Sequence, residues 1–221
     1  MINLANKHLG KICDFYKTWR LKLNPTKTET VWFNAQDKNK GNKINNENKI
    51  IEWSKTCRYL GIWLDEKMNW KAQTRKTKVK AWTTIKALNK LLCKKKSILP
   101  IDSKLQIHRA IVRSIITYGS PIWHTTAETN LEVLRRLDRY VLRKIAAPPR
   151  ELLITNEEIH VGLDIETLQE LMTRLNERFW TKRRLNDNSL IRNIGRDVKK
   201  KPYKNKLIKR CATNPSNSDS D

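Results

Sequence analysis

The sequence predicts an α+β fold that is mostly α, and two patterns support this prediction. In residues 59–64, the aliphatic side chains Leu60, Ile62 and Leu64 alternate with other residues, the period of two of a half-buried β-strand. After Trp70 the apolar residues recur at helical spacing instead. We therefore expect a small antiparallel sheet, backed by one helix, followed by a helical bundle and a flexible tail.

The change of period suggests three regions. Residues 1–70 hold the expected sheet and its backing helix, residues 71–180 hold the helical bundle, and residues 181–221 form a basic to polar tail. The tail ends in NPSNSDSD, a composition that cannot bury enough apolar surface to order itself.

The first region reads as helix, turn and strands. Apolar residues at helical spacing predict a helix over residues 3–20, and Pro25 favours a turn after it. Residues 29–34 and 49–53 read as strands on either side of a polar Asn/Lys/Gly loop at 37–48. The strand that begins at Tyr59 and closes in a turn by Trp70 completes the sheet.

The second region begins with a long basic helix. Its expected apolar stripe is Ala72, Val79, Trp82, Ile85, Leu88 and Leu91, and lysines and arginines cover its other faces. The next helix, with Asp102 as its cap, has an apolar face formed by Leu105, Ile111, Val112, Ile115 and Ile116. Gly119 and Pro121 end this helix, and Trp123 is expected to be buried just beyond.

Two more helices follow. The first has an apolar stripe that ends before Pro148-Pro149 and consists of Leu131, Leu134, Leu137, Val141, Leu142 and Ile145. The second runs from about Ile165 to Phe179 with Asp164 as its cap and Glu166 near its positive end. Helix formation is not expected beyond Thr181.

The charge balance points to a polyanionic partner. The 221 residues include 46 lysines and arginines against 22 aspartates and glutamates, a formal charge of +24 with a pI of about 10.1. Nucleic acid is the first candidate. A membrane surface is disfavoured, because the start of the chain has no acylation signal and no interfacial helix. With no secretory or membrane-spanning segment either, we expect an intracellular protein, with the nucleus as a candidate compartment.

Cysteines and histidines give no sign of a metal site. Cys13, Cys57, Cys93 and Cys211 are scattered without a C-x-x-C pair, which favours free thiols. The four histidines stand apart from any Cys/His spacing, so we expect neither ligand nor catalytic roles for them. The tryptophans on apolar faces, including Trp82, are expected in the core rather than stacked on bases.

Three motifs in order carry a family resemblance. They are WRLKLNPTKTE, then IEW with RYLGIWLD and MNW, and finally AIVRSIITYGSPIW. In this order they resemble the C-terminal part of a jockey-type non-LTR retrotransposon reverse transcriptase, an RNA-directed DNA polymerase. The resemblance covers roughly residues 4–179. It implies a palm remnant ending in the primer-grip strand, followed by the thumb and the segment after it.

The resemblance implies roles for particular residues. Lys27 stands where the palm presents a lysine near the leaving pyrophosphate, as a general acid, although a solvated turn lysine explains it equally well. Tyr59, Leu60 and Gly61 match the primer grip, and burial of Leu60 in the sheet is compatible with that role. The thumb residues Arg75, Lys76, Lys78, Lys80 and Lys86 would face the duplex backbone of an RNA/DNA hybrid, with an ordinary solvated face as the alternative.

The catalytic carboxylates of a reverse transcriptase are missing from the sequence. Nucleotidyl transfer by two metal ions needs a paired-aspartate turn, and the sequence contains no Asp-Asp pair. The resemblance implies Mg²⁺ for the complete polymerase but no cofactor or metal ligand in this chain, so membership of the nucleotidyltransferases does not establish an enzyme here. We expect a truncated copy, or a mis-bounded gene model, that lacks the fingers and the first palm strands of the parent polymerase and that binds primer and template but does not polymerise alone. The alternative is an autonomous basic helical protein that binds RNA or DNA.

Overall fold

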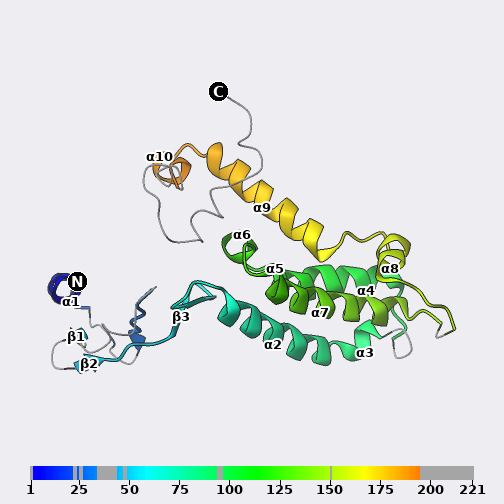
Figure 1. Cartoon of the computed structure of the whole chain (residues 1–221), viewed down its shortest axis with the longest axis horizontal. Helices are drawn as coiled ribbons and strands as arrows, with labels where there is room; N and C mark the ends of the chain where they lie inside the picture. Colours follow the sequence, from blue (N-terminus) through cyan, green and yellow to red (C-terminus); the bar gives the residue numbers. More distant parts are fainter. Residues whose placement is uncertain are drawn as a thin grey trace. The chain divides into compact units, whose positions relative to one another are not determined.

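The computed structural model describes residues 2–21, 24, 27–33, 44–46, 49–93, 97–149 and 151–194. The chain divides into two compact units, residues 1–72 and 73–221, so that the boundary falls in the first turn of a helix. The described part contains several helices and two small antiparallel sheets, which confirms the α+β, mostly α prediction (Figure 1). The flexible tail predicted for the end of the chain lies outside the described residues from residue 195 onward.

The described residues of the first unit form one helix and two two-stranded sheets. Helix α1 (Ile2–Thr18) packs against strand β1 (Ile44–Asn46), which pairs antiparallel with β2 (Lys49–Ile51). Strands β3 (Thr56–Tyr59) and β4 (Ile62–Asp65) form a separate hairpin. The described residues therefore form two sheets where the sequence predicted one.

Two strand predictions and one loop prediction in this unit are wrong in detail. The segment read as a single strand from Tyr59 is a hairpin, because Leu60 and Gly61 form its two-residue turn. Among the described residues of the segment 29–34, only Thr30 makes a β-bridge, to Trp53. Strand β1 lies in the segment read as a polar loop, whose residues 37–43, 47 and 48 are outside the described part.

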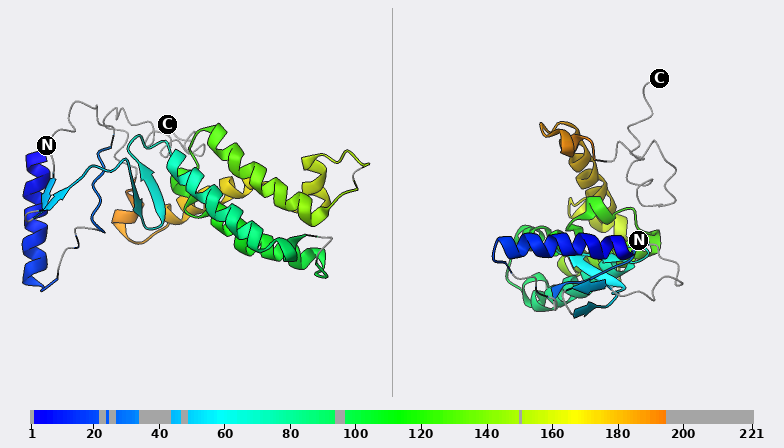
Figure 2. Two further views of the ribbon diagram at one scale, coloured as in Figure 1. Left: turned by 90° about the horizontal axis from the view of Figure 1, so that it is seen from below. Right: turned by 90° about the vertical axis from the view of Figure 1, so that its left-hand side faces the viewer.

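The second unit is helical. Helix α2 leads into a series of shorter and longer helices, whose bounds are α2 Lys71–Ala87, α3 Asn89–Leu92, α4 Ile101–Ile107, the π-helix η3 His108–Arg113, α5 Ser114–Thr117, α6 Ser120–Trp123, α7 Glu128–Ala146, α8 Asn156–Gly162, α9 Leu168–Arg184 and α10 Ser189–Arg192. Within it, α2 and α7 lie side by side in Figures 1 and 2, and α7 also packs against α4, α8 and α9.

The core of this unit is built on α7. All six residues of its predicted apolar stripe are buried, and Trp123 is fully buried as expected. The indole Nε1 of Trp123 donates to the carbonyl of Tyr118 at 2.8 Å, so the polar end of the ring is satisfied inside the core. Val112 and Ile116, from η3 and α5, are also fully buried.

The apolar stripe predicted for the basic helix is only partly correct. Ile85 is buried as predicted, but Val79 is exposed, as is Leu91, which lies in α3. The buried face of α2 consists of Gln73, Thr74, Thr77, Ala81 and Ile85. Small and polar side chains can face the interior here because they satisfy one another, as when Gln73 Nε2 donates to Thr77 Oγ1 at 3.2 Å.

The helix starts also differ from the predicted caps. The predicted cap Asp102 lies in the first turn of α4, which starts after Pro100. Helix α9 begins after Thr167, whose hydroxyl accepts from the Glu170 N–H while the Glu170 carboxylate accepts from the Thr167 N–H. The predicted cap Asp164 instead lies in a turn at φ 45°. Helix α9 continues to Arg184 and α10 follows it, so helical structure extends past Thr181.

Candidate nucleic-acid interface

Helix α2 presents an exposed and strongly basic face. Its sequence contains no acidic residue and six basic ones, Lys71, Arg75, Lys76, Lys78, Lys80 and Lys86, and all six are exposed. They include the five predicted thumb residues. We call these six side chains the α2 basic face.

Helical geometry arranges this face in two rows. Lys71, Arg75, Lys78 and Lys86 follow one another at spacings of three, four or eight residues, which places them on one side of α2. Lys76 and Lys80, four residues apart, form a second row on the other margin of the exposed side. Because the small buried residues of α2 occupy the remaining arc, every basic side chain points away from the core.

Helix α7 has nearly as many basic residues, but its arginines are engaged within the protein. Arg136 and Arg139 both donate to Glu132, and Arg135 contacts Glu128 and Gln169. Arg143 donates to Asn156 Oδ1 and to the Ile154 carbonyl at 3.0 Å, which ties α7 to the start of α8. Sequence reasoning described both helices as basic, and the structure distinguishes them by what their charges contact.

Two lysines lie against aromatic rings between α2 and α7. Lys86 Nζ is 5.5 Å from the centre of the Trp82 ring, and Lys144 Nζ is 4.8 Å from the centre of the Tyr140 ring. The two rings contact each other at 5.3 Å between centroids. Trp82 is 37% exposed, so the expectation that it belongs to the core is wrong.

The β3–β4 hairpin of the first unit exposes the predicted primer-grip residues at its tip. Tyr59 is 65% exposed and Leu60 is 74% exposed, so Leu60 is not buried in the sheet. Leu60 has φ 47° and Gly61 has φ 84°, the left-handed pair that a tight two-residue hairpin turn requires. The sequence thus places an apolar side chain in a turn where Asn, Asp or Gly is usual.

Lys27 is exposed, and its backbone N–H donates to the Asn24 carbonyl at 3.1 Å. This turn position leaves the side chain accessible to a ligand or to solvent. Its role as a general acid remains a prediction.

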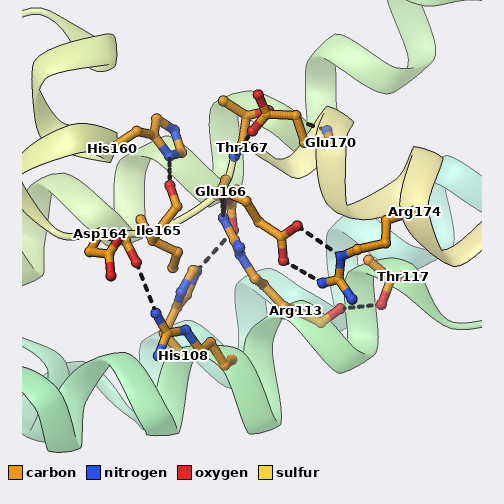
Figure 3. Close-up of polar contacts among 12 residues, drawn as sticks. His108, Arg113, Thr117, His160, Asp164, Ile165, Glu166, Thr167, Glu170 and Arg174 are labelled. Atoms are coloured by element: carbon orange, nitrogen blue, oxygen red, sulfur yellow. Dashed lines mark hydrogen bonds and ion pairs between the residues drawn. The ribbon is translucent and has the colours of Figure 1, made fainter.

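A buried charge cluster that the sequence reasoning missed joins three parts of the helical unit. Asp138 of α7 accepts from Arg113 Nη2 at 2.9 Å and lies 2.9 Å from His108 Nε2, and all three residues are buried. Arg113 also donates to the Glu166 carbonyl at 2.7 Å, while the Glu166 carboxylate faces Arg174 (Figure 3). Burial alone would raise the pKa of Asp138, but the hydrogen bonds and charges of His108 and Arg113 outweigh it and lower the pKa.

We interpret this cluster as a contact between packed helices and not as a reactive site. Both carboxylate oxygens of Asp138 are occupied by side chains of the same chain. The sequence signal was a charge within an apolar stripe, since Asp138 lies between Leu134 and Val141, and His108 lies between Leu105 and Val112.

The described residues do not fit a catalytic metal. No group of three or more His, Cys, Asp or Glu side chains in this part of the chain is arranged to hold an ion. The other buried aspartate, Asp65, accepts the N–H groups of Asn69 and Trp70 at 3.1 and 2.9 Å and so closes the turn after β4. No chemical step is therefore assigned to a metal here.

Comparison with known proteins finds similarity to RNA-directed DNA polymerases of mobile elements. It is 25% identical over 189 residues to a probable RNA-directed DNA polymerase from transposon BS of Drosophila melanogaster, a match that covers 85% of this chain and 20% of that protein. It is 24% identical over 190 residues to the RNA-directed DNA polymerase from mobile element jockey of Drosophila funebris, with 86% and 20% covered. The jockey protein of Drosophila melanogaster matches at 22% identity over 190 residues.

The chain spans about a fifth of the length of these relatives. No protein-family model and no solved structure matches it. None of the described helices is long and apolar enough to cross a bilayer. The matches to the jockey and BS proteins nevertheless confirm the resemblance found in the motifs: the chain is related, over most of its length, to a segment of the RNA-directed DNA polymerases of jockey-type non-LTR retrotransposons.

Proposed function

We propose that the chain is the palm end, primer grip and thumb of a reverse transcriptase, and that it binds the RNA/DNA hybrid through the phosphate backbone. The observation that carries this proposal is the α2 basic face, which has six exposed positive side chains and no acidic residue in the helix. A row of exposed positive charges suits sequence-independent binding to phosphates, as a polymerase that moves along any template requires.

The test measures affinity for a blunt RNA/DNA hybrid by fluorescence anisotropy over a series of KCl concentrations. We expect log K to fall linearly with log[KCl], by roughly 0.9 for each phosphate contact. Replacing Arg75, Lys76, Lys78 and Lys80 together by Gln should weaken binding strongly and flatten this slope.

The matched control is Arg136→Gln with Arg139→Gln and Arg143→Gln on α7, together with Lys182→Gln on α9. This variant also loses four positive charges, but three of them are engaged by Glu132, Asn156 and Ile154. Equal loss of affinity in the two variants would mean that only net charge matters. Failure of the native chain to bind at low salt would overturn the proposal.

The hairpin tip is proposed to contact the primer end. The exposed Tyr59 and Leu60 side chains lie at a turn where Gly61 allows a close approach of the backbone. A hybrid with a recessed primer 3′ end should then bind more tightly than a blunt hybrid, and Leu60→Asn should remove the difference without reducing the affinity for the blunt hybrid. If native protein binds both hybrids equally, the tip has no such role.

Catalysis is proposed to require a longer polymerase. Such a protein would supply the fingers, the palm carboxylates and their Mg²⁺ ions, and Lys27 would act there as a general acid for the leaving pyrophosphate. Primer extension with this chain and Mg²⁺ should give no product, and incorporation would contradict the proposal. In a polymerase that contains this segment, Lys27→Gln should slow incorporation more than Lys27→Arg, whereas equal rates would make Lys27 a surface lysine.

A further inference from the structure

A row of four side chains runs across the contact between α2 and α7. The order is Lys86, Trp82, Tyr140 and Lys144, with the two rings in contact at an interplanar angle of 49° and one ammonium group over each ring. Each lysine lies four residues after its ring on the same helix, the spacing at which side chains meet on a helix surface. We call these four residues the lysine–aromatic cluster.

Packing explains only part of this arrangement. Trp82 and Tyr140 are 37% and 39% exposed, in contrast to Trp123, which is completely buried. Two rings suffice to join the helices, so the joint does not require a lysine over each of them. Within the described part of the chain, neither lysine pairs with a carboxylate, although Lys144 Nζ donates to Asn89 Oδ1 at 2.6 Å.

The rings hold the two ammonium groups in place while leaving some of their donors free. A cation over an aromatic face is attracted by the ring quadrupole, yet an ammonium group has three N–H donors and the ring does not accept all of them. A freely moving lysine loses rotamer entropy when a ligand fixes it, and a lysine already held over a ring loses less on binding. The cluster therefore presents two positioned donors to an anion.

We propose that the lysine–aromatic cluster extends the nucleic-acid contact from α2 onto α7, with Lys86 and Lys144 binding backbone phosphates and with Trp82 and Tyr140 as positioning residues. Lys86 already belongs to the row of Lys71, Arg75 and Lys78, so the cluster continues that row across the helix joint. The ligand is the phosphodiester backbone, since two ammonium groups recognise charge and no base edge. This inference rests on the proposed binding of an RNA/DNA hybrid.

The first measurement removes the two charges. Lys86→Gln with Lys144→Gln should reduce the dependence of log K on log[KCl] by roughly 1.8 for a duplex, because about 0.9 is lost with each phosphate contact. Lys104 is buried and unsuitable as a control, so the charge-matched control is Lys182→Gln with Arg184→Gln, both exposed on α9. The control should leave the slope nearly unchanged.

The second measurement removes a ring and keeps the charges. Tyr140→Phe preserves the ring and should retain native affinity and slope, whereas Tyr140→Leu should weaken binding several-fold with Lys144 still present. Thermal denaturation of each variant identifies any loss of folded protein. A purely structural Tyr140 would give equal affinities for the two folded variants, which would overturn the positioning role.

The outcomes separate this inference from the proposed function. If the native chain does not bind the hybrid, both fail. If the native chain binds and the α2 variant is weakened, but Lys86→Gln with Lys144→Gln behaves like its control, the contact ends on α2 and this inference alone is wrong.

Discussion

Asp138 lies between the side chains of His108 and Arg113, and all three are buried. His108 and Arg113 occupy its two oxygens, and Arg113 continues to the Glu166 carbonyl before α9. Removing one partner of a buried ion pair leaves an uncompensated charge, which costs more than the pair itself contributes. The cluster therefore makes the joint of η3, α7 and the start of α9 sensitive to single substitutions.

We expect Asp138→Asn to lower the free energy of unfolding by about 3–5 kcal/mol, because Arg113 stays buried and charged without its carboxylate. Urea denaturation followed by circular dichroism measures the change. Arg174→Gln is the control, since Arg174 and Glu166 form an exposed pair that contributes about 0–1 kcal/mol. A cost below 1 kcal/mol for Asp138→Asn would contradict the structure of the cluster.

The depressed pKa of Asp138 sets the direction of its pH dependence. A carboxylate whose folded pKa lies below its unfolded value of about 3.9 stabilises the fold fully above that pH, and this contribution is lost as the pH falls through the folded pKa. Between pH 7 and pH 2 the native chain should lose more stability than Asp138→Asn does. If both proteins lose the same stability between pH 7 and pH 2, the charged form of Asp138 does not stabilise the fold.

Sequence patterns could identify the buried residues of α7 but not this cluster. The stripe from Leu131 to Ile145 repeats at helical spacing and fixes which face is buried. His108 and Arg113 precede Asp138 by 30 and 25 residues, respectively. No local pattern in the sequence indicates that η3 packs against α7 at Asp138. Their meeting depends on the packing of helices, which periodicity does not specify.

At the scale of elements, the β3–β4 turn shows why the strand prediction failed. The alternation of Leu60, Ile62 and Leu64 continues through the turn, because a two-residue loop interrupts neither the spacing nor the character of the residues. Of the two turn residues, only Gly61 is of a type that is common in two-residue hairpin turns.

We expect Gly61→Ala to destabilise the hairpin by about 1–2 kcal/mol, since an L-residue with a Cβ resists the left-handed conformation. Leu60→Asn should not destabilise it, because Asn tolerates positive φ. Amide hydrogen exchange of Tyr59 and Ile62, which pair across the hairpin next to the turn, measures both effects. Slower exchange in Gly61→Ala than in the native chain would be inconsistent with the turn described.

The first unit also leaves an apolar surface on α1. Leu4, Ile12, Phe15 and Trp19 are each between 46% and 66% exposed, on the side of the helix that the sequence marks as apolar. The periodicity predicted this stripe, whereas its exposure could only be learned from the structure.

For the whole molecule, the apolar surface of α1 favours self-association, whereas the positive net charge disfavours it. A formal charge of +24 keeps copies apart at low salt, and salt screens that repulsion without weakening apolar association. We expect self-association to increase with KCl, as measured by analytical ultracentrifugation, and Phe15→Gln with Trp19→Gln to suppress the increase. If self-association falls with KCl, charge rather than the α1 surface drives it.

The division of charge between α2 and α7 has a chemical consequence. Five of the six basic residues of α2 are lysines, whereas four of the five of α7 are arginines. An acetyl group neutralises a lysine amine but does not react readily with a guanidinium. Mild acetylation should therefore abolish hybrid binding while far-ultraviolet circular dichroism stays native, since the arginine–carboxylate contacts of α7 survive. Unfolding in step with the loss of binding would contradict this. Most of the charges proposed to contact nucleic acid are therefore amines that acetylation can mask, whereas the charges of α7 that contact other side chains are mostly guanidinium groups that it does not.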